Sequence, residues 1–235
     1  MINKFCKKPL WDCTMKLAKV AAGAEKADLV IQNARLINVC THEIMENISV
    51  AIAEGRICLV GNADHCVGPN TRVIDAENKY LAPAFMDGHI HIESSMLSVG
   101  EYAKAAVAHG TSGVFIDPHE ICNVLGLEGV GYMMEDAKRT PLKTMLTTPS
   151  CVPAVGGFED TGAKMDPEDV AVTMDYDYCV GLGEMMNFPG IINADSQAVA
   201  KIVASQAHHK KIDGHAPGLT GHELNAYISA GVYSD

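Results

Sequence analysis

Two histidines one residue apart, His89 and His91, follow an apolar run that begins after Pro83. In an extended strand, residues i and i+2 point to the same face, so we expect the two imidazoles side by side while Ile90 points into packing. Two imidazoles on one face can bind a divalent cation, and imidazole suits zinc, iron or nickel. The alternative is a chance pair on a partly exposed strand. The spacing makes His89 and His91 candidate metal ligands.

Two further residues extend this chemistry. Glu184 lies among glycines and methionines (181–187), where a carboxylate needs a cation or hydrogen-bond donors. A core salt bridge or a capped turn is the alternative. His215 lies among small residues (213–218) that leave room for a metal or substrate, although a lone histidine is more often a core residue. Together with the histidine pair they supply most of a one- or two-metal site, which would lower the pKa of bound water toward neutrality while carboxylates move protons.

Polar side chains also follow two other predicted strands. Asp117, His119 and Glu120 come at the end of one, and Ser150 follows the next. The first three side chains either support the metal ligands from a second layer or form a further metal site. In the remaining alternative, Asp117 only caps the helix that follows.

After Pro83, apolar strand-like runs alternate with helical patterns. This alternation predicts a parallel sheet with right-handed crossovers. The predicted strands cover residues 84–92, 111–117, 142–147, 179–185, 211–215 and 231–235. The predicted helices cover residues 99–109, 124–139, 167–174, 196–208 and 221–230, and Gly110 is placed to end the first of them.

The positions of the polar residues decide between an open sheet and a barrel. They lie at the C-terminal ends of successive strands, and in a (β/α) barrel all of these ends converge on the face that carries the chemistry. A doubly wound sheet would favour a glycine-rich loop after its first strand, and neither GxGxxG nor GxxxxGK[ST] occurs. The sequence therefore predicts an α/β fold, a (β/α) TIM barrel truncated after about six strands.

The residues before the barrel predict a separate unit. Short strands over 27–39, 48–52, 56–61 and 73–76 indicate a small all-β unit that buries little core alone. An amphipathic segment precedes them. We therefore expect a helical arm over 1–24, a small β domain over 25–82, and a partial barrel over 83–235 that carries the metal site.

Composition limits the partners and the compartment. With 48% hydrophobic and 20% charged residues the chain is typical of a soluble globular protein. Its net charge of −11 argues against nucleic acid or an anionic membrane surface as a partner, and no apolar run is long enough to span a bilayer. Eight cysteines at irregular spacings, with neither a CxxC pair nor a signal peptide, predict a reducing cytoplasm.

Taken together, these motifs resemble the amidohydrolase superfamily, and within it the bacterial adenine deaminases. The resemblance covers about residues 25–235. HxH is shared across the superfamily, whereas the other blocks are more specific to the deaminases. The motifs are MDGHIHIESSM (86–96), HGT (109–111) with DPHE (117–120), PSCVPA (149–154), GEMMN (183–187) and DGHAPGL (213–219).

The resemblance implies two divalent metal ions, manganese or iron, with zinc as an alternative. His89 and His91 would bind the first ion. Glu184 would take the bridging position that a carboxylated lysine fills in related hydrolases, and His215 would bind the second ion. The implied reaction is the hydrolytic deamination of adenine to hypoxanthine and ammonia, with Glu184 and His215 as catalytic residues.

The same resemblance implies a small purine base as the partner and a homo-oligomer for the full-length protein. Ser150 and Glu93 are assigned to substrate binding. The family continues past Asp235 into a further histidine and glutamate, and then a late-strand aspartate that binds metal and moves protons. We therefore expect a fragment of a longer deaminase with an incomplete site and little activity alone.

Two other functions remain open on the sequence. One is a cyclic amidohydrolase of the dihydroorotase or hydantoinase type, which a lysine in place of Glu184 would have favoured. The other is a non-catalytic fragment that packs against a partner chain. The cytidine-type zinc deaminases are excluded, because they need PCxxC in addition to HxE, and no PCxxC occurs.

Overall fold

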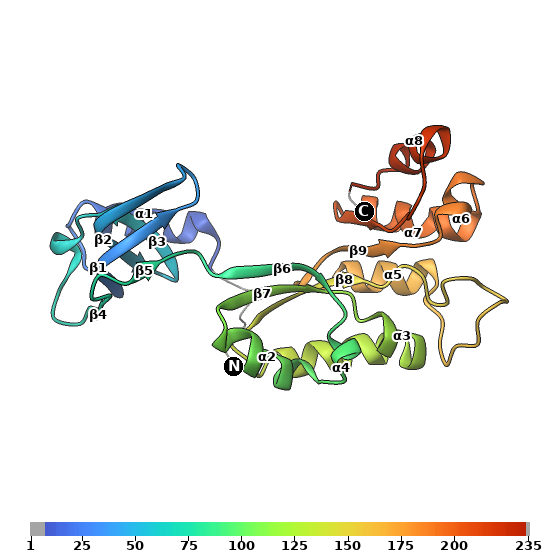
Figure 1. Cartoon of the computed structure of the whole chain (residues 1–235), viewed down its shortest axis with the longest axis horizontal. Coiled ribbons are helices and arrows are strands. Elements are labelled where there is room, and N and C mark those ends of the chain that lie inside the picture. Colours follow the sequence, from blue (N-terminus) through green and yellow to red (C-terminus); the bar gives the residue numbers. More distant parts are fainter. Residues whose placement is uncertain (1–7, 234–235) are drawn as a thin grey trace. The chain divides into compact units, whose positions relative to one another are not determined.

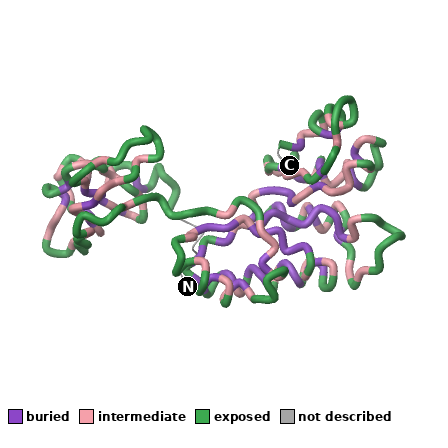
Figure 2. The backbone as a smooth tube through the Cα atoms, viewed as in Figure 1, coloured by how far each residue is buried: buried purple, intermediate pink, exposed green. Residues whose placement is uncertain are grey.

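The computed structural model describes residues 8–233. The chain divides into two compact units, Met1–Ala84 and Phe85–Asp235, and each is described by itself (Figure 1). Each unit has buried residues of its own along its strands (Figure 2). Between residues 8 and 233, no helix combines the length and the apolar character needed to cross a membrane.

The N-terminal unit is a mixed sheet with one helix packed against it. Helix α1 (Leu10–Ala21) contacts β2 and β3 and buries Val20 in a core of mostly alanine and valine. The sheet has the order β3-β2-β1-β4, with β5 beside β1, and β1 pairs antiparallel with β2 but parallel with β4. Its elements are β1 (Leu29–Asn38), β2 (Glu43–Ala53), β3 (Arg56–Gly61), the 3-10 turn η1 (Asp64–Cys66), β4 (Arg72–Asp75) and β5 (Tyr80–Leu81).

The C-terminal unit contains a parallel sheet in the order β10-β9-β8-β7-β6. Each strand pairs with its neighbour in sequence, as a (β/α) barrel requires. The middle strands β7, β8 and β9 are the most buried, whereas β6 exposes Phe85 and Met86 (Figure 2). The strands are β6 (Phe85–Ile90), β7 (Thr111–Ile116), β8 (Lys143–Thr148), β9 (Cys179–Met185) and β10 (Lys211–Gly214).

Helices connect these strands and pack on the sheet (Figure 1). Helix α2 contacts β7, α4 contacts β8, α5 contacts β8 and β9, and α7 contacts β9 and β10. The elements are the 3-10 turn η2 (Ile92–Ser95), α2 (Val99–Ala108), α3 (His119–Leu125), α4 (Leu127–Ala137), α5 (Pro167–Met174), α6 (Phe188–Ile192), α7 (Ser196–Ala207) and α8 (Gly221–Ser229).

Local sequence signals set where these helices begin and end. Asp166 accepts the N–H of Asp169 at 2.9 Å, and Asp169 in return accepts the N–H of Asp166 at 3.2 Å. This capping box places Pro167 at the first turn of α5. Asp195 caps α7 with its side chain. Gly110 has φ +92° just after α2, and this left-handed conformation ends a helix and favours glycine.

The structure corrects the sequence predictions in several places. The predicted strand over 84–92 ends at Ile90, before the turn η2. The predicted strand over 231–235 is wrong over 231–233, where the N–H of Tyr233 donates to the carbonyl of Ile212 in β10 at 3.1 Å but no strand forms; residues 234–235 lie outside the described residues. Asp117 does not cap the next helix, because α3 has Pro118 at its N-cap and no side-chain cap. The short helices α3 and α6 were not predicted as separate elements, because neither spans enough turns to show a hydrophobic period.

Candidate metal centre

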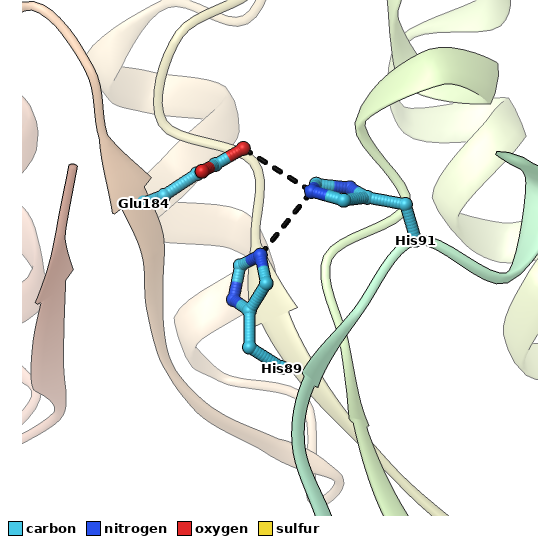
Figure 3. A group of neighbouring side chains, drawn as sticks. All are labelled: His89, His91 and Glu184. Carbon is cyan, nitrogen blue, oxygen red and sulfur yellow. Dashed lines mark hydrogen bonds and ion pairs between the residues drawn. The ribbon is translucent and has the colours of Figure 1, made fainter. Parts of the chain in front are cut away.

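His89, His91 and Glu184 meet at the carboxyl ends of β6 and β9 (Figure 3). His89 Nε2 lies 3.2 Å from His91 Nε2, which in turn lies 3.2 Å from Glu184 Oε1. Three strand intervals separate β6 from β9 in the sheet order, or about 14 Å in a flat sheet. Only a curled sheet brings these side chains into contact. The site therefore depends on the barrel-like curvature of the C-terminal unit.

The backbone of Asp117 fixes the tautomer of His91. His91 Nδ1 lies 2.7 Å from the carbonyl oxygen of Asp117, and because a carbonyl only accepts, Nδ1 carries a proton and donates it. In the neutral imidazole, Nε2 then presents a lone pair to the Glu184 carboxylate. Two such acceptors 3.2 Å apart repel unless a proton or a cation lies between them. Imidazole and carboxylate donors in this arrangement fit a divalent cation.

His215 joins the cluster from the end of β10. Its Nδ1 lies 3.3 Å from Glu184 Oε2, so each carboxylate oxygen of Glu184 faces an imidazole. The side chain of Glu184 is 14% exposed and that of His215 is 50% exposed. Glu184 is thus the central group, with His91 on one side and His215 on the other.

Asp117 is fully buried beside this cluster. Neither of its carboxyl oxygens has a hydrogen-bond partner among the described residues. A Cβ at Gly183 would lie 2.2 Å from Asp117 Oδ2, so the glycine makes room for the carboxyl group. Burial, together with the charge of Glu184, raises the pKa of Asp117 well above its usual value. Asp117, His119 and Glu184 could hold a metal ion as a second set of donors, with one ligand atom of each within 4.8 Å of the others.

The side chain of His119 is buried next to that of Asp117, but the two side chains form no hydrogen bond with each other. Its Nδ1 lies 3.9 Å from Asp117 Oδ1, and that nitrogen has no hydrogen-bond partner among residues 8–233. Burial lowers the pKa of His119, which favours the neutral imidazole. A neutral imidazole beside a buried carboxyl group is suited to metal binding or to proton exchange.

Two more carboxyl groups lie near His91. Glu120 Oε2 is 3.5 Å from His91 Nδ1, and Glu120 Oε1 accepts the hydroxyl proton of Ser94. Glu93 Oε1 accepts the N–H of Ile121 at 3.3 Å, while its Oε2 is buried without a partner among the described residues. Burial raises the pKa of Glu93. The region around His91 is therefore rich in carboxyl groups, and among residues 8–233 neither Glu93 nor Glu120 forms an ion pair with lysine or arginine.

Ser150 forms a hydrogen bond with the backbone of Glu184. It is buried, and its hydroxyl donates to the carbonyl oxygen of Glu184 at 2.6 Å. The carbonyl oxygen of Ser150 accepts a hydrogen bond from Lys201 Nζ at 2.7 Å, and burial lowers the pKa of Lys201. A cavity of about 620 Å³ adjoins this chain of contacts and is lined by Ser150, Met185, Asn187 and Lys201 among others. None of the four histidine and glutamate residues of the cluster lines it.

All of the side chains singled out in the sequence come from the C-terminal unit, but they do not all converge. His89, His91, Glu184 and His215 form one continuous cluster. Glu93 and Ser150 make backbone contacts at its periphery. Four contributing residues were not singled out in the sequence. Ser94 donates to Glu120, and Asp213 lies 3.9 Å from His89. Lys201 donates to the Ser150 carbonyl, and the Tyr227 hydroxyl accepts the N–H of His215. Asp213 could have been found, since residues 213 and 215 share one face of an extended strand.

Comparison with protein families matches residues 80–233 to the Amidohydrolase family. This match covers more than half of the chain. The chain belongs to the amidohydrolase family. The predicted fold class is confirmed: a partial (β/α) barrel of the amidohydrolase type and a separate N-terminal sheet. The family is metal-dependent, and this amidohydrolase chain contains candidate metal-binding residues.

Curated relatives of this amidohydrolase include proteins named adenine deaminase. The chain is 60% identical over 233 residues to an adenine deaminase of Clostridium botulinum (strain ATCC 19397 / Type A), covering 99% of this chain and 39% of the relative. It is 48% identical over 231 residues to an adenine deaminase of Ruegeria pomeroyi, covering 97% of this chain and 38% of that protein. The chain thus spans well under half the length of these relatives.

Solved structures support the fold. An atrazine chlorohydrolase from Arthrobacter aurescens, complexed with zinc, superposes with a TM-score of 0.62 at 13% identity, covering 86% of this chain and 58% of that one. A crystal structure of an adenine deaminase gives a TM-score of 0.56 at 15% identity, covering 87% and 54%. At these identities the likeness shows the amidohydrolase fold.

Proposed function

We propose that this chain contributes the metal-binding strands of a hydrolase that converts adenine to hypoxanthine and ammonia. The observation that carries the proposal is the 60% identity, over 99% of this chain, to a protein named adenine deaminase. The cluster of His89, His91 and Glu184 supports it, because the reaction needs an activated water molecule. Because the chain spans 39% of that relative, the activity and the substrate both belong to the proposal.

The donor set supports two divalent ions, manganese or iron, with zinc as an alternative. His89 and His91 would hold one ion, His215 would hold the other, and Glu184 would be a ligand shared by both. When bound, such ions supply a water nucleophile that is active near neutral pH, for attack on the amino-bearing carbon of the purine. Asp117, His119 and Glu120 would support these ligands or form a further metal site.

Glu184 and His215 are proposed as the groups that move protons. Their side chains meet at Glu184 Oε2 and His215 Nδ1, which are 3.3 Å apart, so both lie where the attacking water would lose its proton and departing ammonia would gain one. Glu93, with a buried oxygen free of protein partners among the described residues, is proposed to contact the purine ring, as is Ser150.

The setting of this enzyme is also proposed. A purine base would be the small-molecule partner. Nucleic acid and membranes would not be partners, and the full-length protein would form a homo-oligomer. The net charge of −11 supports the exclusion of nucleic acid. Cysteines 13, 40, 58, 66, 122, 151 and 179 are free thiols, which supports a reducing cytoplasm.

A segment exchange tests the proposed reaction. The matching 233-residue segment of the Clostridium botulinum relative is replaced by this chain. The chimera is expected to release ammonia from adenine, to lose this activity on treatment with a chelator, and to regain it with Mn²⁺. The matched control is the same chimera carrying Glu184→Gln, which is expected to be inactive. A folded chimera that binds Mn²⁺ but does not act on adenine contradicts the proposed substrate.

A further inference from the structure

Tyr227 joins the main chains that carry Glu184 and His215. It lies on α8 and is 1% exposed. Its hydroxyl donates to the carbonyl oxygen of Met185 at 2.6 Å and accepts the N–H of His215 at 3.1 Å. One hydroxyl group therefore contacts the residue after Glu184 and the backbone of His215 at the same time.

This bridge lies where the sheet itself becomes irregular. Strand β10 pairs with β9 at Ile212↔Leu182 and next at Gly214↔Met185, with a shift of register between the two pairs. His215 follows the last residue of β10, so it lies past the regular ladder. Buried backbone groups need partners, and at this point the Tyr227 hydroxyl supplies an acceptor for one strand and a donor for the other.

A tyrosine suits this task for two reasons. Its hydroxyl can donate one hydrogen bond and accept others, so it can pair with a carbonyl and an N–H together. Its ring has only two side-chain torsions, so a buried tyrosine holds its hydroxyl in one place. Helix α8 also contacts α6, which follows β9, so the helix is anchored on the Glu184 side of the site.

We propose that Tyr227 is a positioning residue for the candidate metal centre. By tying Met185 to His215, it sets the approach of His215 Nδ1 to Glu184 Oε2, which lie 3.3 Å apart. The inference rests on the proposed function to the extent that these two residues act as metal ligands. A tyrosine that only fills the core would contribute to stability but would leave the relative placement of the two ligands unchanged.

The test compares Tyr227→Phe with Thr173→Val in the 235-residue chain. Thr173 is equally buried, and its hydroxyl accepts from Thr148 Oγ1 at 2.7 Å, away from the ligands. Each variant therefore removes one buried hydroxyl and is expected to lower stability by a similar amount. Only Tyr227→Phe should alter the cluster.

Two readouts separate positioning from stability. In the metal-free chain, backbone amide exchange of His215 is expected to accelerate about tenfold in Tyr227→Phe and to stay unchanged in Thr173→Val. Affinity for Mn²⁺, followed by electron paramagnetic resonance, is expected to fall about tenfold in Tyr227→Phe only. Unchanged His215 exchange in Tyr227→Phe overturns the inference, as does an equal loss of Mn²⁺ affinity in both variants.

The outcomes distinguish this inference from the proposed function on which it rests. If the wild-type chain binds no Mn²⁺, the metal centre is contradicted, whereas the exchange comparison still decides whether Tyr227 holds His215. Should Tyr227→Phe fail to fold, 3-fluorotyrosine incorporated at residue 227 alone keeps both ring and hydroxyl. Its fluorine resonance is expected to shift when Zn²⁺ is added. A resonance that does not move, with Zn²⁺ bound or with none bound, overturns the inference.

Discussion

The two sides of the candidate metal centre are held in different ways. His89 lies in β6 and His91 directly follows it; this strand pairs with one neighbour among the described strands and exposes much of its surface. The side chains of His89 and His91 are 33% and 25% exposed, against 14% for Glu184. Glu184 is the second-last residue of the buried strand β9, and the hydroxyls of Ser150 and Tyr227 donate to the backbone carbonyls of Glu184 and Met185.

This contrast shows two ways in which a candidate metal ligand is placed: by the alternation of side chains along an extended strand, or by contacts from other elements of the fold. The β6 pair needs only an extended backbone and one hydrogen bond from His91 to Asp117. The β9 side needs Ser150, which follows β8, and side chains from α7 and α8 to place one carboxylate between two imidazoles. Substitutions on the β9 side should therefore affect metal binding more than comparable changes on β6.

The largest expected effect follows Glu184→Gln. This substitution keeps the shape of the side chain but removes the charge that faces both His91 and His215. We expect Mn²⁺ affinity, measured by isothermal titration, to fall by more than about 100-fold. A normal melting temperature would show that the fold is retained. An affinity equal to that of the wild type would mean that Glu184 is not a metal ligand and that the β9 side does not dominate metal binding.

Substitutions of His89 and His91 are expected to lower Mn²⁺ affinity by a smaller factor, and to differ from each other. His91 is oriented by the Asp117 carbonyl at 2.7 Å, whereas the Nδ1 of His89 lies 3.9 Å from Asp213 Oδ2. His91→Gln should weaken Mn²⁺ binding by about 10- to 100-fold, and His89→Gln should weaken it less. The same titration, run on the two variants side by side, measures the difference. The reverse order would mean that orientation by Asp117 is unimportant.

Asp117→Asn is expected to act in opposite directions on stability and on metal binding. The buried, unpartnered carboxyl group destabilises the metal-free protein at neutral pH, so the variant should be more stable by about 1–3 kcal/mol in urea unfolding. Loss of its charge should weaken binding of Mn²⁺. A variant that is less stable without metal would show that the carboxyl group has a stabilising role of its own.

The smallest effect on Mn²⁺ affinity is expected for Lys201, which contacts Glu184 only through Ser150. Lys201→Met removes the hydrogen bond to the Ser150 carbonyl and should weaken Mn²⁺ binding by up to about tenfold. Because burial lowers the pKa of Lys201 below 10.5, the folded wild type loses this proton before the unfolded chain does. Wild-type stability should therefore gain a contribution as pH rises from the folded pKa toward 10.5, and the variant should lack it.

The exposed lysine Lys104 provides the control for this last prediction. Its side chain is 71% exposed and pairs only with Glu101 on the same helix. Lys104→Met should change neither Mn²⁺ affinity nor the alkaline rise in stability by a measurable amount. Equal behaviour of the two lysine variants would mean that Lys201 does not support Glu184.

The sequence predicts those features that follow from backbone periodicity. The bounds of β9 and α5 agree with the predicted ones. An apolar run marks β9, and a proline in the first turn marks the start of α5. The HxH pair and the glycine-flanked Glu184 could likewise be read from the sequence. The contacts of Tyr227 and Lys201 could not, because they depend on how α7 and α8 pack on the strand ends. The domain limits at residues 24 and 82 stay a prediction.

The central claim is that a divalent cation binds at the strand ends between His89, His91 and Glu184. Crystals of the 235-residue chain loaded with Mn²⁺ can be measured at a wavelength where manganese scatters anomalously. The expected result is an anomalous peak bounded by His89 Nε2, His91 Nε2 and Glu184 Oε1. A loaded crystal whose peaks all lie elsewhere, or that shows none, would contradict it.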